Sequence, residues 1–170
     1  MNWTTTIESH NVAETIELGR RIGSALASGD IIALVGPLGA GKTHLTKGLA
    51  LGLGARDERQ VSSPTFVLVN QYRARVTVFH VDAYRLTNAD QLEAIGFSEM
   101  CTDRSAVVIV EWADRVKSAI DPAALWIELH IEEGDHRRIV VTTINATLSD
   151  RLARAGLDHP QPSDDKSTHG

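Results

Sequence analysis

Apolar residues recur along this chain with two different periods, and the alternation predicts helices and strands in turn. Between positions 12 and 26 they return every three or four residues, as on the buried face of a helix, and Gly29 follows as a stop signal. Residues 43–53 show the same spacing. Ile31–Val35 and 106–110 are instead unbroken apolar runs, which are typical of parallel strands buried on both faces. The order of these elements indicates an α/β fold.

The remaining apolar segments alternate more loosely and predict two hairpins and one interrupted helix. The hairpin strands are 66–71 with 76–81, and 125–131 with 138–144. A helix is expected over 88–100, with a break at Gly96. Buried parallel strands combined with antiparallel hairpins predict an α/β sandwich of three layers, with a mixed parallel and antiparallel sheet.

Length and composition fit one globular domain followed by a polar tail. The chain has 170 residues, of which 42% are hydrophobic and 23% charged, and these fractions exclude a disordered or fibrous protein. We expect the domain to span residues 1–150. Residues 151–170 are mostly polar and include Pro160 and Pro162, so we expect a disordered C-terminal tail there.

Charge and cysteine content narrow the class of protein further. The formal net charge of −5 argues against a protein whose main function is to bind nucleic acid directly through its own surface. The single cysteine, Cys101, excludes an internal disulfide and a cysteine-rich metal site, and fits a reducing compartment. No stretch reaches the roughly 18 consecutive apolar residues that span a bilayer, and the N-terminus lacks the build of a signal peptide. We therefore expect a cytoplasmic protein without a membrane partner.

One motif indicates specific chemistry. Residues 36–43 read Gly-Pro-Leu-Gly-Ala-Gly-Lys-Thr, which matches the G-x-x-x-x-G-K-[ST] pattern of a P-loop and lies between an apolar strand and a helix. The glycines let backbone N–H groups face phosphate oxygens at a helix N-terminus. Lys42 adds a mobile positive charge, and Thr43 offers a hydroxyl to Mg²⁺. We expect nucleotide contacts from Gly36, Gly39, Ala40, Gly41, Lys42, Thr43 and His44.

Two carboxylates at strand ends are candidates for the acidic residue that a P-loop hydrolase needs for its metal. Glu111 follows the run 106–110, and Asp82 follows the strand 76–81. We expect Glu111 to hold Mg²⁺ together with Thr43, and Asp82 to position or deprotonate the attacking water. The alternative for either carboxylate is a solvated charge at the edge of a sheet.

A threonine, a tryptophan and two histidines near the motifs can each be interpreted as functional or as structural residues. Thr65, in the Ser-Ser-Pro-Thr segment 62–65, either senses the γ-phosphate from a mobile loop or belongs to a simple turn. Trp112 either lies against a nucleotide base or fills the core. His44 and His80 have no partner in the sequence that would make them metal ligands, so we expect no metal binding from them.

The nucleotide and the reaction class follow partly by elimination. An Asn-Lys-x-Asp run, which guanine-specific GTPases need, does not occur, so ATP is the expected nucleotide. A small-molecule kinase is the main competitor, and its lid would need an arginine. Arg137 and Arg138 form the only double arginine after the P-loop. A nucleotide-sensing module that binds ATP without turnover is the other alternative.

Four segments of the chain converge on one known family. In order they are 36–43, Ser-Pro-Thr-Phe-Val-Leu-Val-Asn-Gln-Tyr at 63–72, His-Val-Asp-Ala-Tyr-Arg-Leu at 80–86, and Val-Glu-Trp at 110–112. Together they resemble the TsaE (formerly YjeE) family, the bacterial ATPases of the tRNA threonylcarbamoyladenosine pathway. The resemblance extends over roughly residues 10–145, and its second and third segments are far more specific than a P-loop alone.

The resemblance implies a P-loop NTPase fold with a mixed sheet, Mg²⁺-dependent ATP binding and slow hydrolysis. It also implies two protein partners: TsaD, which installs the threonylcarbamoyl group on N6 of adenosine 37 in tRNAs that read ANN codons, and its companion TsaB. The protein would meet tRNA only indirectly, through that complex. The expected function is an accessory ATPase of this modification, with the kinase and the sensor as alternatives.

Residue roles carried over from the family agree with those chosen from the residues. The resemblance assigns Mg²⁺ to Thr43 and Glu111, and it makes Asp82 the aspartate needed for activity. It places Thr65 in the loop over the phosphates. With Lys42, the residues Asp82 and Thr65 are therefore the expected catalytic residues. Glu111 and the neighbouring Trp112 are also expected to belong to the nucleotide site.

The resemblance implies further nucleotide contacts, and the sequence departs from the family at two positions. The implied contacts are those of residues 9–11 and of Arg137. His44 stands where a second threonine is common in the family, and Ala83 stands where a bulkier residue such as leucine is common. Both departures concern local packing more than chemistry.

Overall fold

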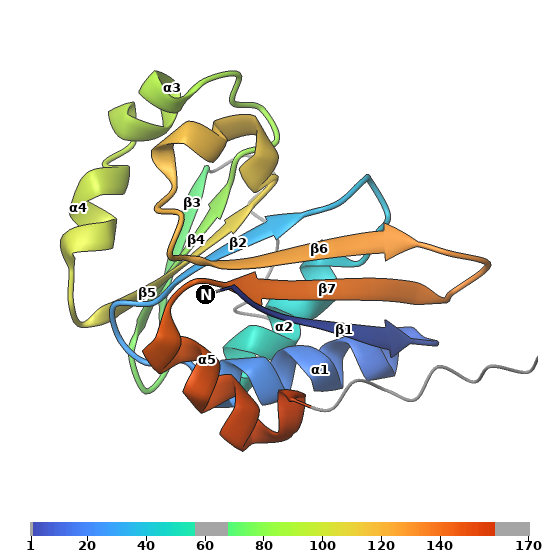
Figure 1. Ribbon diagram of the computed structural model, residues 1–170. Helices are drawn as coiled ribbons and strands as arrows, with labels where there is room; N and C mark the ends of the chain where they lie inside the picture. The colour runs from blue at the N-terminus through green and yellow to red at the C-terminus, as the bar shows by residue number, and fades with distance from the viewer. Residues whose placement is uncertain (1, 57–67, 159–170) are drawn as a thin grey trace, which may run out of the picture.

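A central sheet of seven strands carries the fold (Figure 1). The structure is a computed structural model that describes residues 2–56 and 68–158. Along the sheet the strands lie in the order β1-β7-β6-β2-β5-β4-β3. Their bounds are β1 (Trp3–Ser9), β2 (Ile31–Val35), β3 (Val69–Arg73), β4 (Thr77–Asp82), β5 (Ala106–Glu111), β6 (Leu125–Ile131) and β7 (Arg137–Thr143).

Helices lie on both faces of the sheet, so that the molecule has three layers. Figure 1 shows α1, α2 and α5 on one face, and α3, α4 and η2 toward the other. Their bounds are α1 (Val12–Ala25), α2 (Lys42–Gly52), α3 (Ala89–Ala94), α4 (Phe97–Thr102), the 3₁₀ helix η2 (Ala113–Ala119), α5 (Ala146–Leu152) and the π-helical turn η3 (Ala153–Leu157). Within the described residues, no helix has the length and apolar character needed to cross a bilayer.

Strand pairing is mixed and brings the ends of three strands to one edge. β2 pairs in parallel with β5 and β6, and β4 pairs in parallel with β5. The pairs β1–β7, β6–β7 and β3–β4 are antiparallel. β2, β4 and β5 therefore end together, and the register places Asp82 beside Glu111. This arrangement confirms the predicted α/β fold of the P-loop NTPase kind, with a mixed sheet.

The central strands are buried on both faces, as their apolar runs predict. In β2, Ile32 and Leu34 belong to the core under α1 and α2, whereas Ala33 belongs to the core on the side of α3, α4 and η2. Every residue of β5 is buried, and this includes Glu111 at its end. The sheet therefore presents a carboxylate inside an otherwise hydrophobic layer.

Helices α1 and α2 contact each other backbone to backbone. Each carries two glycines four residues apart, and a methyl group on any of them would overlap main-chain atoms of the other helix: Gly19 and Gly23 in α1, Gly48 and Gly52 in α2. A Cβ atom at Gly48, for example, would run into the carbonyl oxygen of Ile16. This close contact sets the position of α2, which begins with Lys42 and Thr43.

The first strand, β1, was not predicted from the sequence. It is an edge strand, paired only with β7 among the described strands. Its buried positions include Thr5 and Ser9, and its exposed positions include Thr4 and Thr6. Because polar residues occupy both faces, the hydrophobic pattern carries no strand signal there.

The domain extends beyond the boundary expected at residue 150, which falls inside α5. Leu152 and Leu157 are buried in the same core as α1. Arg151 forms an ion pair with Asp30, with its Nη1 atom 2.8 Å from Oδ2. The first part of the expected tail is therefore packed helix, and residues 159–170 lie outside the described residues.

Other elements agree with the prediction within a few residues. The helix expected over 88–100 is divided into α3 and α4 at Gly96, whose φ of +86° is in the left-handed region that favours glycine. The hairpin expected from 66–71 and 76–81 is β3–β4. Its first strand runs on to Arg73, because Tyr72 pairs with Val78 and is buried.

Candidate functional site

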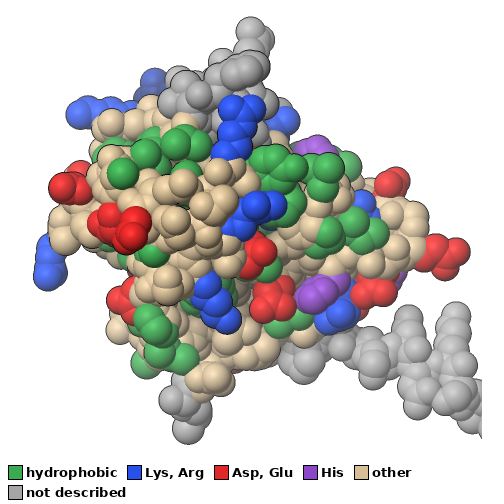
Figure 2. All heavy atoms as spheres, turned by 90° about the horizontal axis from the view of Figure 1, so that it is seen from above, with side chains coloured by type: hydrophobic (Ala, Val, Ile, Leu, Met, Phe, Trp, Pro, Cys, Tyr) green, Lys and Arg blue, Asp and Glu red, His purple; other side chains and the backbone are tan. Residues whose placement is uncertain are grey.

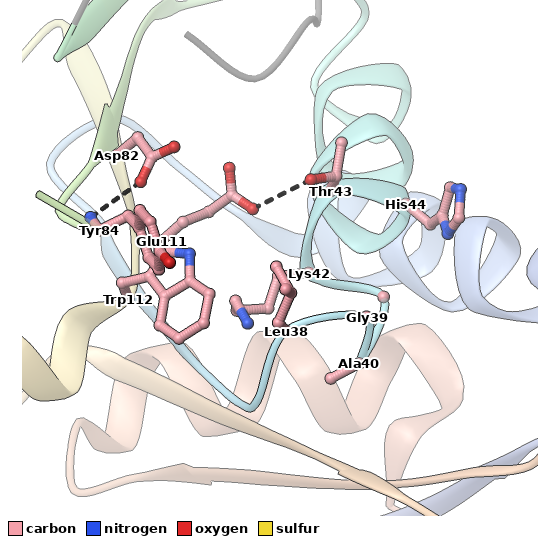
Figure 3. Close-up of a pocket in the computed structure, with 11 residues that line it drawn as sticks. Leu38, Gly39, Ala40, Lys42, Thr43, His44, Asp82, Tyr84, Glu111 and Trp112 are labelled. Atoms are coloured by element: carbon pink, nitrogen blue, oxygen red, sulfur yellow. Dashed lines mark hydrogen bonds between the residues drawn. The ribbon is translucent and has the colours of Figure 1, made fainter. Parts of the chain in front are cut away.

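A cavity of about 320 Å³ opens at the edge of the sheet where β2, β4 and β5 end (Figure 3). This volume lies in the range of small-ligand sites, and ligands of α/β sheets bind outside the carboxyl ends of the strands. The lining comes from the P-loop, the start of α2 and the ends of β4 and β5: Leu38, Gly39, Ala40, Gly41, Lys42, Thr43, His44, Asp82, Tyr84, Glu111 and Trp112.

The P-loop backbone owes its shape to glycines in the left-handed region. Gly39 has a φ of +79° and Gly41 a φ of +102°, which side-chain-bearing residues rarely adopt. Gly41 is also the N-cap of α2. Because glycine has no side chain, it cannot accept a hydrogen bond from the backbone N–H groups in the first turn of the helix. These donors, at the positive end of the helix dipole, suit an anion in the cavity.

Lys42 is buried and extends toward Trp112 (Figure 3). Its Nζ atom donates to the carbonyl oxygens of Gly36 and, at 2.9 Å, of Pro37, and it lies 3.7 Å from the centroid of the Trp112 ring. Burial lowers the pKa of Lys42, and nearby carboxylates, first that of Glu111, partly oppose the shift. The ammonium group is thus held by neutral carbonyls and an aromatic face, and it would gain from a phosphate partner.

Glu111 lies between two hydrogen-bonding side chains. Thr43 Oγ1 donates to its Oε1 atom at 3.4 Å, and His80 Nε2 lies 2.5 Å from its Oε2 atom. Glu111 is 2% exposed and His80 is fully buried. The structure therefore brings together Thr43 and Glu111, the two predicted metal ligands, which are 68 residues apart in the sequence. In the described ranges, no group of three or more His, Cys, Asp or Glu side chains is placed to hold a metal.

Asp82 extends from the end of β4 on the same wall of the cavity as Glu111 (Figure 3). Its Oδ1 atom accepts a hydrogen bond of 2.9 Å from the backbone N–H of Tyr84. Burial raises the pKa of Asp82, the Tyr84 N–H opposes that shift, and the negative charge of Glu111 adds to it. A raised pKa makes this carboxylate a better proton acceptor than an ordinary surface aspartate.

Two aromatic rings, those of Tyr84 and Trp112, form the remaining wall, and an arginine outside the lining lies against them. Trp112 has a φ of +58° and is the one non-glycine residue with positive φ in the described part of the chain. Such strain clusters at functional sites. The ring of Tyr84 packs on Trp112 with centroids 4.8 Å apart, and the Arg115 guanidinium lies 5.0 Å from the Tyr84 centroid. The rings therefore border the cavity next to Lys42.

Most predicted nucleotide-contacting residues line the cavity, but Gly36 and Arg137 do not. The carbonyl oxygen of Gly36 instead accepts a hydrogen bond from Lys42 Nζ. Arg137 reaches the P-loop from outside and donates to the carbonyl oxygens of Gly39 and Ala40, each at 3.2 Å. His44 lines the cavity but points away from Lys42 in Figure 3.

The remaining candidates have structural partners or lie outside the described residues. Asn11 caps α1 by accepting from the Glu14 N–H at 2.8 Å, and Ser9 bonds to Thr15 at 2.8 Å. Neither residue lines the cavity. Thr65 lies outside the described residues.

Sequence reasoning missed Tyr84 and His80. His80 lies two residues before Asp82 on the same face of β4, whereas Tyr84 follows the strand in a turn, where its backbone N–H bonds to the Asp82 carboxylate. A histidine within the otherwise apolar segment 78–81 was a usable signal. Its partner, Glu111, is 31 residues further along the chain, so that only the sheet register reveals the pair.

Comparison with known proteins identifies the family. The model of the family described as "Threonylcarbamoyl adenosine biosynthesis protein TsaE" matches residues 9–140. Several relatives carry the name "tRNA threonylcarbamoyladenosine biosynthesis protein TsaE". The one from Treponema pallidum is 38% identical over 133 residues, which cover 78% of this chain and 96% of the relative. The one from Streptomyces coelicolor is 41% identical over 145 residues, which cover 83% and 95%.

A solved structure agrees with the sequence matches. The crystal structure of Bacillus subtilis YdiB superposes with a TM-score of 0.75 at 26% sequence identity, over 92% of this chain and 98% of YdiB. The family match also spans the whole set of cavity-lining residues, from Leu38 to Trp112. The chain belongs to the TsaE family of threonylcarbamoyl adenosine biosynthesis proteins.

Proposed function

We propose that this protein is a Mg²⁺-dependent ATPase of threonylcarbamoyladenosine biosynthesis in tRNA, an accessory subunit that acts on a TsaB–TsaD complex. One observation carries the chemical part of the proposal: the Thr43 hydroxyl and the Glu111 carboxylate meet at 3.4 Å in a cavity formed by the P-loop. The names of the relatives support the pathway.

The donor atoms at this point fit Mg²⁺. This ion takes oxygen ligands, and in nucleotide sites it is held by one or two protein groups together with phosphates and water. Thr43 and Glu111 would be the protein ligands. When bound, Mg²⁺ would neutralise the charge on the β- and γ-phosphates during phosphoryl transfer.

The side chains of the chain itself would bind and orient the reactants. Lys42 would exchange the carbonyl oxygens of Gly36 and Pro37 for phosphate oxygens, which are stronger partners because they carry charge. Asp82, whose pKa is raised by burial, would orient the attacking water or accept its proton. Thr65 would contact the γ-phosphate as the family resemblance implies.

The surface of the protein favours dependence on a partner. The net charge is −5, and acidic and basic side chains are interspersed over the described part of the face in Figure 2. A partner with a basic surface would then hold the tRNA. Two apolar side chains of the cavity lining, Leu38 and Tyr84, are 79% and 47% exposed. A docked partner would cover them, complete the geometry for hydrolysis, and be released or reset when ATP is cleaved.

The test is steady-state ADP release from ATP and Mg²⁺, measured for the protein alone and with purified TsaB and TsaD. Glu111→Gln removes the metal-binding charge and keeps the shape of the side chain. Glu99→Gln is the matched control, because it makes the same change at an exposed position in α4. We expect slow release alone, stimulation by the two proteins, and loss of activity only in Glu111→Gln.

Other outcomes identify the alternatives. ADP release that requires a small-molecule acceptor and ignores TsaB and TsaD would indicate a kinase. ATP binding without release in either setting would indicate a sensor. Equal activity of Glu111→Gln and the unmodified protein would refute the proposed metal site.

A further inference from the structure

Next to the predicted metal ligand lies a histidine that no role described so far uses. His80 on β4 is fully buried, and its Nε2 atom lies 2.5 Å from Oε2 of Glu111. His80 is absent from the cavity lining, so Glu111 separates it from any bound nucleotide. Its other ring nitrogen, Nδ1, has no hydrogen-bond partner within the described part of the chain.

We propose that His80 is a positioning residue, which holds the Glu111 carboxylate in the orientation that presents Oε1 to Thr43 and to the metal. The proposal rests on the proposed function, because it assigns to Glu111 the role of metal ligand. His80 acts through Glu111 and touches neither nucleotide nor metal.

The geometry gives each oxygen of the carboxylate one partner. Oε2 accepts from His80 Nε2–H on the inner side, and Oε1 accepts from Thr43 Oγ1 on the cavity side. The terminal torsion of a glutamate is broad and roughly two-fold, so a carboxylate without the inner partner could turn away from Thr43. A hydrogen bond to a carboxylate in a buried setting is short and strong, and it restricts that rotation.

The unpartnered Nδ1 atom indicates which nitrogen carries hydrogen. Burying an N–H group without an acceptor costs free energy, and burying a ring nitrogen that carries no hydrogen costs less. The hydrogen therefore belongs on Nε2, where Glu111 accepts it. Ligands of metal sites are commonly oriented by such outer hydrogen bonds, and loss of one typically costs about 10- to 100-fold in metal affinity or activity.

Three substitutions separate positioning from mere packing. In His80→Gln the amide nitrogen takes the place of Nε2 and retains the donor. In His80→Asn the shorter amide places its nitrogen near Nδ1 and does not reach Glu111. His80→Leu fills the space without a donor. The measured quantity is the dissociation constant of a non-hydrolysable ATP analogue by calorimetry, in Mg²⁺ and in EDTA, with thermal unfolding of each variant as a check of the fold.

We expect Mg²⁺ to tighten binding in the unmodified protein and in His80→Gln. In His80→Asn and His80→Leu that gain should fall about tenfold or more, while binding in EDTA changes less than about twofold. If His80→Leu fails to fold, the comparison of the Gln and Asn variants still tests the proposal. A gain that is kept in His80→Asn, or lost equally in the Gln and Asn variants, would overturn it.

A second readout does not depend on nucleotide at all. In protein labelled with ¹⁵N-histidine, NMR should show hydrogen on Nε2 of His80, and Glu111→Gln should shift that signal. Hydrogen on Nδ1 would overturn the proposal. If Mg²⁺ fails to tighten binding in the unmodified protein, the proposed metal site fails and the positioning role fails with it. If the gain depends on Glu111 and not on His80, the positioning role alone is refuted.

Discussion

Arg137 donates from its Nε atom to the carbonyl oxygen of Ala40 at 3.2 Å, across 97 residues of sequence. The same guanidinium donates to Gly39 in the P-loop and to Gly134 and His136 beside it in the β6–β7 hairpin. In a planar trans peptide the C=O and the following N–H point in opposite directions. The bond that draws the Ala40 carbonyl toward Arg137 therefore turns the Gly41 N–H away from it.

From this contact we predict that Arg137→Met weakens binding of ATP by about 5- to 30-fold, which corresponds to about 1–2 kcal/mol for the lost hydrogen bonds to P-loop carbonyls. Calorimetric titration with ATP and Mg²⁺ measures the change. Arg138→Met is the matched control, because Arg138 is adjacent and pairs with Glu132 instead of the P-loop. Equal losses in the two variants would contradict the prediction.

Lys42→Met should abolish detectable ATP binding and leave the thermal stability unchanged within about 1 kcal/mol. Burial lowers the pKa of Lys42, so the folded protein tolerates its charge at a cost that a methionine does not carry. Thermal unfolding without nucleotide measures the stability. Lys47→Met, on the same helix, controls for the loss of a lysine. A large drop in melting temperature for Lys42→Met alone would show that the ammonium group supports the fold.

Asp82→Asn should raise the melting temperature near neutral pH. The native pKa of Asp82 is raised, so the native state binds the proton more tightly than the unfolded chain, and ionisation lowers stability as pH rises through that interval. Asparagine removes this loss and still accepts from Tyr84 N–H through its Oδ1 atom. The gain should therefore be present at about pH 7 and disappear near about pH 4.

Thermal unfolding across this pH range checks the prediction for Asp82→Asn. Asp103→Asn is a control of opposite sign, because the hydroxyl and the N–H of Ser105 lower the pKa of Asp103. Its carboxylate stabilises the native state once it is ionised, and that stabilisation is lost as pH falls through the native pKa. A gain for Asp82→Asn that does not change with pH would show that its cause is not electrostatic.

Gly48→Ala should destabilise the fold by at least about 2 kcal/mol, because the added methyl group would overlap the carbonyl oxygen of Ile16. For a domain of this size, that lowers the melting temperature by on the order of 4–8 °C. Lys47→Ala, at the neighbouring position of α2, is the control and should have little effect. An unchanged melting temperature for Gly48→Ala would mean that the helices can separate without cost.

Local patterns in the sequence were sufficient for much of the fold. Helix α1 follows from its helical periodicity, strands β2 and β5 follow from unbroken apolar runs, and the break at Gly96 follows from a glycine within a helical pattern. β1 gives no such signal, since its inward positions include Thr5 and Ser9. The helix after residue 150 was missed because its few buried residues, Leu152 and Leu157, stand among charged neighbours.

The candidate site was predictable to the extent that its residues are marked by local spacing. The P-loop is one continuous motif, and Asp82 and Glu111 each end a strand, so their proximity follows from parallel pairing. The bond from His80 to Glu111 depends on register between distant strands. The hydrogen bonds of Arg137 to backbone carbonyls could not be predicted, because every residue type offers such a carbonyl. Direct contact of Arg137 with a nucleotide stays a prediction.

The glycine contact between α1 and α2 has a consequence for motion. At the four glycines main chain lies against main chain, so the contact there contains no side chain that could change rotamer and let one helix slide along the other. We therefore expect the helix that begins with Lys42 and Thr43 to keep its position relative to α1 when a nucleotide binds. If a nucleotide binds, we expect the structural response in the Lys42 side chain and in the segments that carry Tyr84 and Trp112, which line the cavity, and not in the position of this helix.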